Sequence, residues 1–166
     1  MILRAYQNEN VEDLRQGFRL GFGRQLLQSA TGSGKTVLFC FMTKGAIDKG
    51  LRVMIIAHRS EILDQIDATL KQFGIEAGHI RSGIPMDRTK KVFVASIQTL
   101  VRRFDDIPAP DLVIVDESHH SAASQYVQMF ARYSKSKFIG VTATPERLDG
   151  RGLNEFFGRL VHGPKV

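Results

Sequence analysis

The fold is decided by residues 25–36, which read Gln-Leu-Leu-Gln-Ser-Ala-Thr-Gly-Ser-Gly-Lys-Thr. A short apolar run leads into a glycine-rich turn, and a helical pattern begins at Thr36. Glycines let backbone N–H groups approach a phosphate closely, and the start of the following helix adds a favourable dipole. These features predict a phosphate-binding loop between a strand and a helix, with its turn formed by Thr31, Gly32, Ser33 and Gly34.

Two side chains at the end of this loop carry specific chemistry. Lys35 is placed to bridge the β- and γ-phosphates of a nucleotide, and the Thr36 hydroxyl is placed to bind Mg²⁺. Ser29 stands where the general pattern of such loops has its first glycine. The alternative is a flexible glycine turn without a ligand, and the strand-to-helix context disfavours it.

Four more apolar runs follow along the chain, at residues 52–57, 91–95, 112–115 and 137–141. Their hydrophobicity is continuous rather than alternating, which is typical of parallel strands buried on both faces. Helical patterns cover residues 36–49, 60–73, 97–104 and 124–133. We expect Gly50 to end the first helix and Ser60 to be the N-cap of the second. This alternation predicts one doubly wound α/β domain over residues 1–166.

Asp116 and Glu117 come directly after the apolar run 112–115. In a phosphoryl-transfer site, Asp116 would hold Mg²⁺ and Glu117 would deprotonate the attacking water. Taken alone, such a pair is more often a solvated loop start or a helix cap. Combined with the phosphate loop, it predicts two neighbouring strand ends at which one Mg²⁺ bridges Thr36 and Asp116.

Composition narrows the class of protein. The 166 residues are 43% hydrophobic and 24% charged, which is typical of a globular domain and not of a disordered chain. The single cysteine forbids an intrachain disulfide, and we expect a cytoplasmic protein without a signal peptide or a membrane span. The net charge of +6 permits a polyanionic partner without identifying one.

Several motifs in order resemble the first RecA-like lobe of superfamily 2 helicases of the DExH kind. The phosphate loop at Ser29–Thr36 and the box Asp116-Glu117-Ser118-His119 match that group, as do Leu3-Arg4-Ala5-Tyr6-Gln7 and Thr142-Ala143-Thr144-Pro145. The resemblance implies that Arg4 and Gln7 help to bind the adenine of ATP, and that Thr142 and Thr144 couple hydrolysis to movement. His119 is interpreted as a polar coupler beside the ATP site. The alternatives are a surface histidine at 119 and, for Gln7, an exposed residue at a helix start.

Two further segments resemble motifs of these helicases that contact nucleic acid. They are residues 57–65, which contain Arg59, and residues 96–100, in which Ser96, Gln98 and Thr99 are candidates to contact the sugar-phosphate backbone. Single polar residues in loops are otherwise usually solvated. A solvated face is also the main interpretation for the basic residues Arg81, Arg88, Lys90, Lys91, Arg102 and Arg103.

The resemblance extends from Leu3 to Arg147 and is closest to type III restriction helicase subunits and related bacterial or phage helicases. It implies a RecA-like P-loop NTPase fold, with ATP and Mg²⁺ as cofactors. Nucleic acid is the implied partner, with DNA favoured over RNA. The second RecA-like lobe that completes such an ATP site is absent from this chain, so we expect weak hydrolysis by the isolated lobe. The alternatives are a non-catalytic module that binds nucleic acid or a partner, and a P-loop phosphotransferase, for which no lid segment is found.

Overall fold

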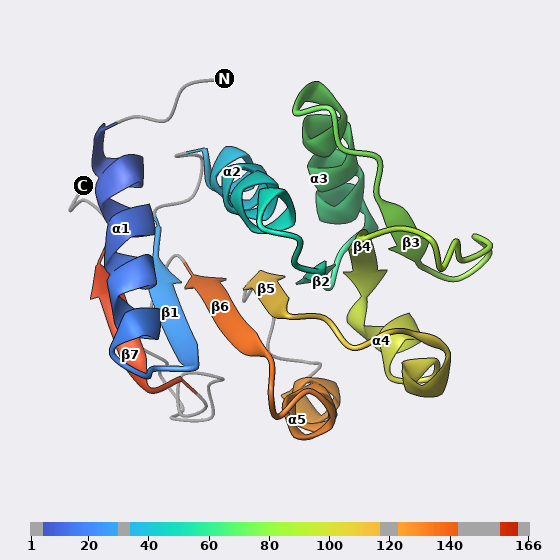
Figure 1. Cartoon of the computed structure of the whole chain (residues 1–166). Helices are drawn as coiled ribbons and strands as arrows, with labels where there is room; N and C mark the ends of the chain where they lie inside the picture. Colours follow the sequence, from blue (N-terminus) through green and yellow to red (C-terminus); the bar gives the residue numbers. More distant parts are fainter. Residues whose placement is uncertain (1–4, 30–33, 117–122, 143–156, 163–166) are drawn as a thin grey trace.

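The computed structural model describes residues 5–29, 34–116, 123–142 and 157–162 (Figure 1). These residues contain a seven-stranded sheet in the order β3-β4-β2-β5-β6-β1-β7, and every pairing between neighbouring strands is parallel. The strands are β1 Arg24–Gln28, β2 Val53–Ala57, β3 Gly78–Ile80, β4 Val92–Ser96, β5 Leu112–Asp116, β6 Lys137–Thr142 and β7 Arg159–His162.

Helices cover both faces of this sheet (Figure 1). They are α1 Ala5–Arg19, α2 Lys35–Asp48, α3 Ser60–Gln72, α4 Ile97–Leu100 and α5 Ala123–Arg132, with a short 3₁₀ turn, η1, at Phe104–Asp106. The central strands supply alternate residues to two separate cores. Ile55 and Ile114 pack with α1, α2 and α3, whereas Met54 and Val113 pack with α4 and α5. This arrangement confirms the doubly wound α/β fold.

All five predicted strands are confirmed, and the predicted helices differ from the structure mainly at their ends. Gly50, with φ of +82°, follows α2 as expected. The prediction of Ser60 as an N-cap is wrong by one residue, because Arg59 has the extended N-cap conformation and α3 begins at Ser60. The predicted helix 97–104 is wrong in length, since α4 ends at Leu100 and turns lead into η1.

A buried polar contact fixes α1 against the sheet. The Gln25 side chain is fully buried, and its Nε2 donates to the carbonyl of Leu14 at 2.7 Å. Its Oε1 accepts a hydrogen bond from Arg159 Nη1 at 2.7 Å, which joins β1 to the neighbouring β7. A Cβ at Gly17 would collide with this glutamine, so the glycine lets α1 approach the sheet closely.

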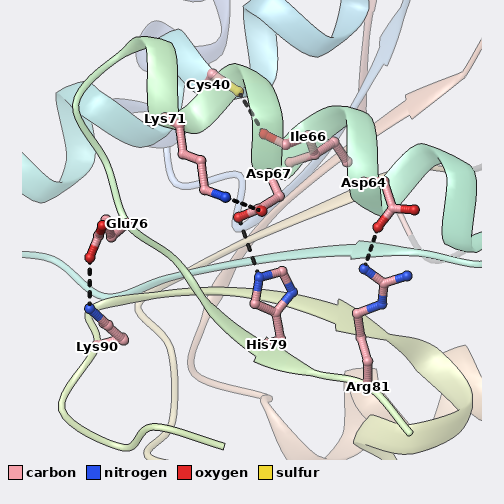
Figure 2. Close-up of polar contacts among 9 residues, drawn as sticks. All are labelled: Cys40, Asp64, Ile66, Asp67, Lys71, Glu76, His79, Arg81 and Lys90. Carbon is pink, nitrogen blue, oxygen red and sulfur yellow. Dashed lines mark hydrogen bonds and ion pairs between the residues drawn. The ribbon is translucent and has the colours of Figure 1, made fainter. Parts of the chain in front are cut away.

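Ion pairs join α3 and the loop after it to β3 and the segment between β3 and β4 (Figure 2). Asp67 contacts both Lys71 on its own helix and His79 on β3, each at 3.3 Å. Arg81 lies 2.7 Å from Asp64, and Lys90 lies 3.5 Å from Glu76. Figure 2 draws both pairs as dashed lines.

Cys40 lies on α2 and faces α3 in the core. Its thiol is fully buried and lies 3.8 Å from the carbonyl oxygen of Ile66 (Figure 2). Burial disfavours the thiolate and raises the pKa of Cys40 to about 12. The residue therefore packs as a small apolar side chain at neutral pH.

Candidate functional site

The phosphate loop ends in a backbone turn that favours glycine. Gly34 has φ of +80°, in the left-handed region, and α2 begins directly after it at Lys35. Gln7 lies against the same turn, because its Nε2 donates to the carbonyl oxygen of Gly34 at 3.4 Å. Gln7 is only 4% exposed, so the alternative of an exposed residue at the helix start is wrong. The first turns of α1 and α2 therefore meet at the end of the predicted phosphate loop.

Lys35 and Asp116 form an ion pair of 2.9 Å between Nζ and Oδ1. Asp116 is the last residue of β5 and its side chain is fully buried, whereas the Lys35 side chain is 19% exposed. The structure thus joins the phosphate loop to the acidic strand end, which are 81 residues apart in the sequence.

The expectation of neighbouring strand ends needs one correction. β6 lies between β1, which leads into the phosphate loop, and β5, which ends at Asp116. The strand order is therefore different from the one expected, and the lysine side chain spans the gap. Thr142 at the end of β6 lies in the middle: it pairs with Gln28 on β1, and its carbonyl accepts the Ser29 N–H at 2.8 Å.

Asp116 also fits the metal that the resemblance implies. Its Oδ2 is buried and has no hydrogen-bond partner among the described residues. A buried carboxylate oxygen without a partner is costly, and a hard divalent cation or its bound water would satisfy it. The described part of the chain contains no cluster of three or more His, Cys, Asp and Glu side chains that could hold a metal. One carboxylate and the partly exposed Thr36 are typical of Mg²⁺, which keeps most of its water.

A second polar cluster joins the two segments predicted to contact nucleic acid. Ala57 on β2 pairs with Ser96 on β4, so both segments leave the sheet side by side. Ser96 Oγ donates to Gln98 Oε1 at 2.7 Å, and Gln98 Nε2 lies 2.8 Å from His58 Nδ1. Gln98 Oε1 accepts the hydrogen bond from the Ser96 hydroxyl, so Gln98 Nε2 is the amide nitrogen that faces His58. An amide nitrogen only donates, and His58 Nδ1 must therefore accept.

The four residues predicted to contact nucleic acid differ in their exposure to solvent. Arg59 is exposed, and Ser96 and Gln98 are partly exposed, so all three present surface beside the cluster. Thr99 is only 9% exposed and has little surface for a backbone contact. His58 was missed by sequence reasoning. Its only signal is its position, directly before Arg59 at the end of an apolar run.

The basic residues first interpreted as a solvated face are partly engaged in ion pairs. Arg81 pairs with Asp64, Lys90 with Glu76, and Arg88 with Asp106 at 3.2 Å. Such pairs are mostly exposed and contribute little to stability. These pairs lower the net positive charge of the surface on which they lie.

Seven of the predicted site residues lie outside the described residues. They are Arg4, Thr31, Gly32, Ser33, Glu117, His119 and Thr144. Within the described residues, no helix is long and apolar enough to cross a membrane.

Comparison with known proteins identifies the family. Residues 1–147 match the family described as the type III restriction enzyme, res subunit. The putative ATP-dependent helicase IRC3 of Saccharomyces cerevisiae is 32% identical over 182 residues, which cover 97% of this chain and 26% of IRC3. A 51.5 kDa protein of a Lactococcus phage is 32% identical over 141 residues, covering 85% of this chain and 28% of that protein. The chain thus spans about a quarter of the length of these relatives.

The fold of this chain is also similar to the folds of solved structures. The Type ISP restriction-modification enzyme LlaGI, solved as a nuclease-deletion mutant with a DNA substrate mimic, superposes with a TM-score of 0.76 at 17% identity. The superposition covers 99% of this chain and 20% of LlaGI. The family match and the parallel sheet together show that the chain belongs to the family of type III restriction enzyme res subunits and has the fold of the N-terminal RecA-like lobe of superfamily 2 helicases.

Proposed function

We propose that this lobe binds ATP with Mg²⁺ and, completed by a second RecA-like lobe, hydrolyses ATP to drive movement along nucleic acid. The 2.9 Å contact between Lys35 and Asp116 carries the proposal, because it unites the phosphate-binding and metal-binding motifs in one site. The family match over residues 1–147 and the helicase relative support the same function.

In the proposed complex, the residues of the loop Thr31 to Lys35 surround the phosphates. Lys35 leaves Asp116 and pairs with the β- and γ-phosphates, while Thr36 and Asp116 hold Mg²⁺, whose charge offsets that of the triphosphate. The buried Gln7 beside Gly34 supports a place for the adenine near the start of α1, where Arg4 also belongs.

Hydrolysis is assigned to residues around the same strand ends. Glu117 takes the proton of the attacking water, and His119 couples this site to the neighbouring segment. Thr142 and Thr144 transmit the state of the nucleotide. The position of Thr142 between the phosphate-loop strand and the Asp116 strand supports this assignment. A second lobe would supply arginine side chains, which in related phosphoryl-transfer enzymes raise the rate by ~10³–10⁵.

Nucleic acid is proposed to contact the surface formed by Arg59, Ser96 and Gln98, with Thr99 behind it. Contacts to the backbone carry no base specificity, so binding of many sequences is expected. We favour DNA over RNA as the substrate, and the DNA substrate mimic bound by LlaGI is consistent with this choice. The single buried Cys40 suits a reducing compartment such as the cytoplasm.

The test measures binding and turnover separately. A fluorescent ATP analogue with Mg²⁺ should bind the 166-residue chain, and Lys35→Ala should abolish this binding. In a two-lobed protein containing this chain, Glu117→Gln should keep ATP binding and remove turnover, because an amide cannot accept the proton. Retained turnover in that variant, or rapid nucleic-acid-stimulated turnover by the isolated chain, would contradict the proposal.

A further inference from the structure

A pocket of about 790 Å³ lies where β5 and β6 begin, at the opposite end of these strands from the proposed nucleotide site, and we name it the α1–α2 groove. It is lined by the last turn of α2 and by Leu112 and Lys137, the first residues of β5 and β6. Asp116 and Thr142 are the last residues of these two strands. The groove is therefore one strand length away from the ion pair of Lys35 and takes no part in nucleotide binding.

The floor of the groove is apolar. It consists of Val11, Leu14 and Phe18 on α1, Met42 and Ala46 on α2, and Ile139 on β6. Most of these residues belong to the core between the helices and the sheet, and Met42 and Ala46 keep 9% and 8% of their surface exposed. At the mouth, Leu51 is 36% exposed. An open apolar pocket of this size is typical of a binding surface.

The rim is strongly basic. Six cationic side chains line the groove, and Asp111 is the one acidic side chain among the lining residues: the cations are Arg15, Arg19, Lys49, Arg132, Lys135 and Lys137. Asp111 accepts the backbone N–H of Arg52. Exposed pairs join Arg15 and Arg19 to Glu12, and Arg132 to Asp105, and these leave a positive excess.

Gly45 lines the groove without contributing a side chain to it. It lies within α2 and lines the groove, and glycine in a helix costs about 0.5–1 kcal/mol relative to alanine. The backbone does not require glycine here, because its φ is not positive and a Cβ would meet nothing closer than Arg15 Nη2 at 3.8 Å. The effect of the missing side chain is therefore on the groove and not on the fold of the helix.

We propose that the α1–α2 groove binds an acidic amphipathic helix of a partner protein. The apolar floor takes the apolar face of that helix, and the basic rim pairs with carboxylates along its flanks. A helix fits because the lining residues come from α1, from α2, and from β5, β6 and the segments before them, and β5 and β6 are inner strands with no free edge for an extended peptide. A helix also satisfies its own backbone hydrogen bonds. Two other occupants fit less well. A nucleic acid backbone offers charged phosphates and no apolar face to cover the apolar floor. A second copy of this chain has a net charge of +6 and would be repelled by the basic rim.

The test uses a fluorescein-labelled peptide of about 18 residues, or five helical turns, with leucines at helical spacing and glutamates on both flanks. Fluorescence anisotropy should show saturable binding to the 166-residue chain, and a scrambled peptide of the same composition should bind ~10-fold more weakly. Gly45→Trp fills the groove without changing charge, and Lys49→Glu with Lys135→Glu reverses charge without filling it. Each should weaken binding by ~10-fold or more.

Lys44→Glu is the matched control, because Lys44 is exposed on the same helix, pairs with Asp48 and does not line the groove. It should bind the peptide like the unchanged chain, and circular dichroism should show all variants folded. Equal peptide affinity in Gly45→Trp and the control, or no binding at all, would overturn the proposal. So would displacement of the peptide by duplex DNA, or a dimer in sedimentation experiments that Gly45→Trp dissociates.

Discussion

At the scale of single residues, the site is governed by one buried carboxylate and its partner. Asp116 has no exposed side-chain surface, and in the described structure Lys35 supplies its neutralising charge. Removing one member of a buried pair costs about 3–5 kcal/mol, because the other charge is left without compensation. Lys35 is partly exposed, so it tolerates the loss of its partner better than Asp116 does.

We therefore expect Lys35→Ala to lower the free energy of unfolding by ~3 kcal/mol without nucleotide, and Asp116→Asn to lower it by less. Urea denaturation of both single variants and the double variant measures the coupling. Equal effects of the two single variants, with no coupling, would mean that the 2.9 Å contact does not form in solution.

Cys40 makes a prediction about pH. Burial raises the pKa of its thiol from 9.0 to about 12, so the folded state holds the proton more tightly than the unfolded state. Stability from this group is complete below pH 9 and is lost as the pH rises toward 12. Melting temperatures measured between pH 7 and 11 should fall above pH 9. The fall should be smaller for Cys40→Ala, when each protein is compared with its own melting temperature at pH 7.

The accessibility of the same thiol gives an independent check. A thiol reagent at pH 8 should fail to modify Cys40 in the folded chain and should modify one thiol per chain in urea. Rapid modification of the folded chain would contradict the buried position of Cys40 between α2 and α3.

At the scale of elements, the cluster of Ser96, Gln98 and His58 couples two segments that leave adjacent strands. We expect His58→Leu to weaken nucleic-acid binding by about fivefold, the equivalent of one lost hydrogen bond of ~1 kcal/mol. ATP binding should not change, because His58 lies outside the proposed nucleotide site. His58→Asn is the matched variant, since its side-chain oxygen can accept the Gln98 proton and should restore part of the affinity.

Filter binding of a short duplex together with a fluorescent ATP analogue separates the outcomes. Unchanged duplex affinity in His58→Leu would remove His58 from the nucleic-acid surface. A loss of both affinities would instead indicate a general defect in folding.

Sequence patterns predicted the elements that are buried on both faces. β2, β4 and β5 are continuous apolar runs, and α3 buries one apolar face formed by Leu63, Ile66 and Leu70. β3 and β7 were not predicted, because they are edge strands of three and four residues with little apolar signal. α1 was not predicted because its buried side includes Gln7, Asn10 and Gly17, which interrupt the hydrophobic period.

Sequence motifs predicted which residues form the candidate site, but not the order of the strands that carry them. The ion pair of Lys35 with Asp116 was not predicted, and the position of β6 between their strands depends on pairing across the whole sheet, which no local pattern encodes. The contact of His58 with Gln98 joins residues 40 positions apart and depends on the β2–β4 pairing in the same way.

At the scale of the whole molecule, ligand binding and stability are linked. A ligand that binds only the folded chain stabilises it by about 2.7 kcal/mol at a hundredfold excess over Kd. For a domain of this size, that corresponds to a rise of ~5–10 °C in Tm. We expect ATP with Mg²⁺ to produce this rise, and ATP with EDTA to produce a smaller one. Differential scanning fluorimetry measures both, and no shift at saturating ATP and Mg²⁺ would contradict a nucleotide site in this lobe.

We also expect the ion pair between Lys35 and Asp116 to make metal binding at this site depend on bound nucleotide. While the Lys35 ammonium group pairs with Asp116 Oδ1, its positive charge opposes a divalent cation at Oδ2, so we expect the lobe without nucleotide to bind free Mg²⁺ weakly. When a triphosphate pairs with Lys35, Asp116 loses its neutralising partner, and we expect it to bind Mg²⁺ more tightly. We therefore expect the binding of ATP and of Mg²⁺ to be positively coupled, so that each raises the affinity of the site for the other.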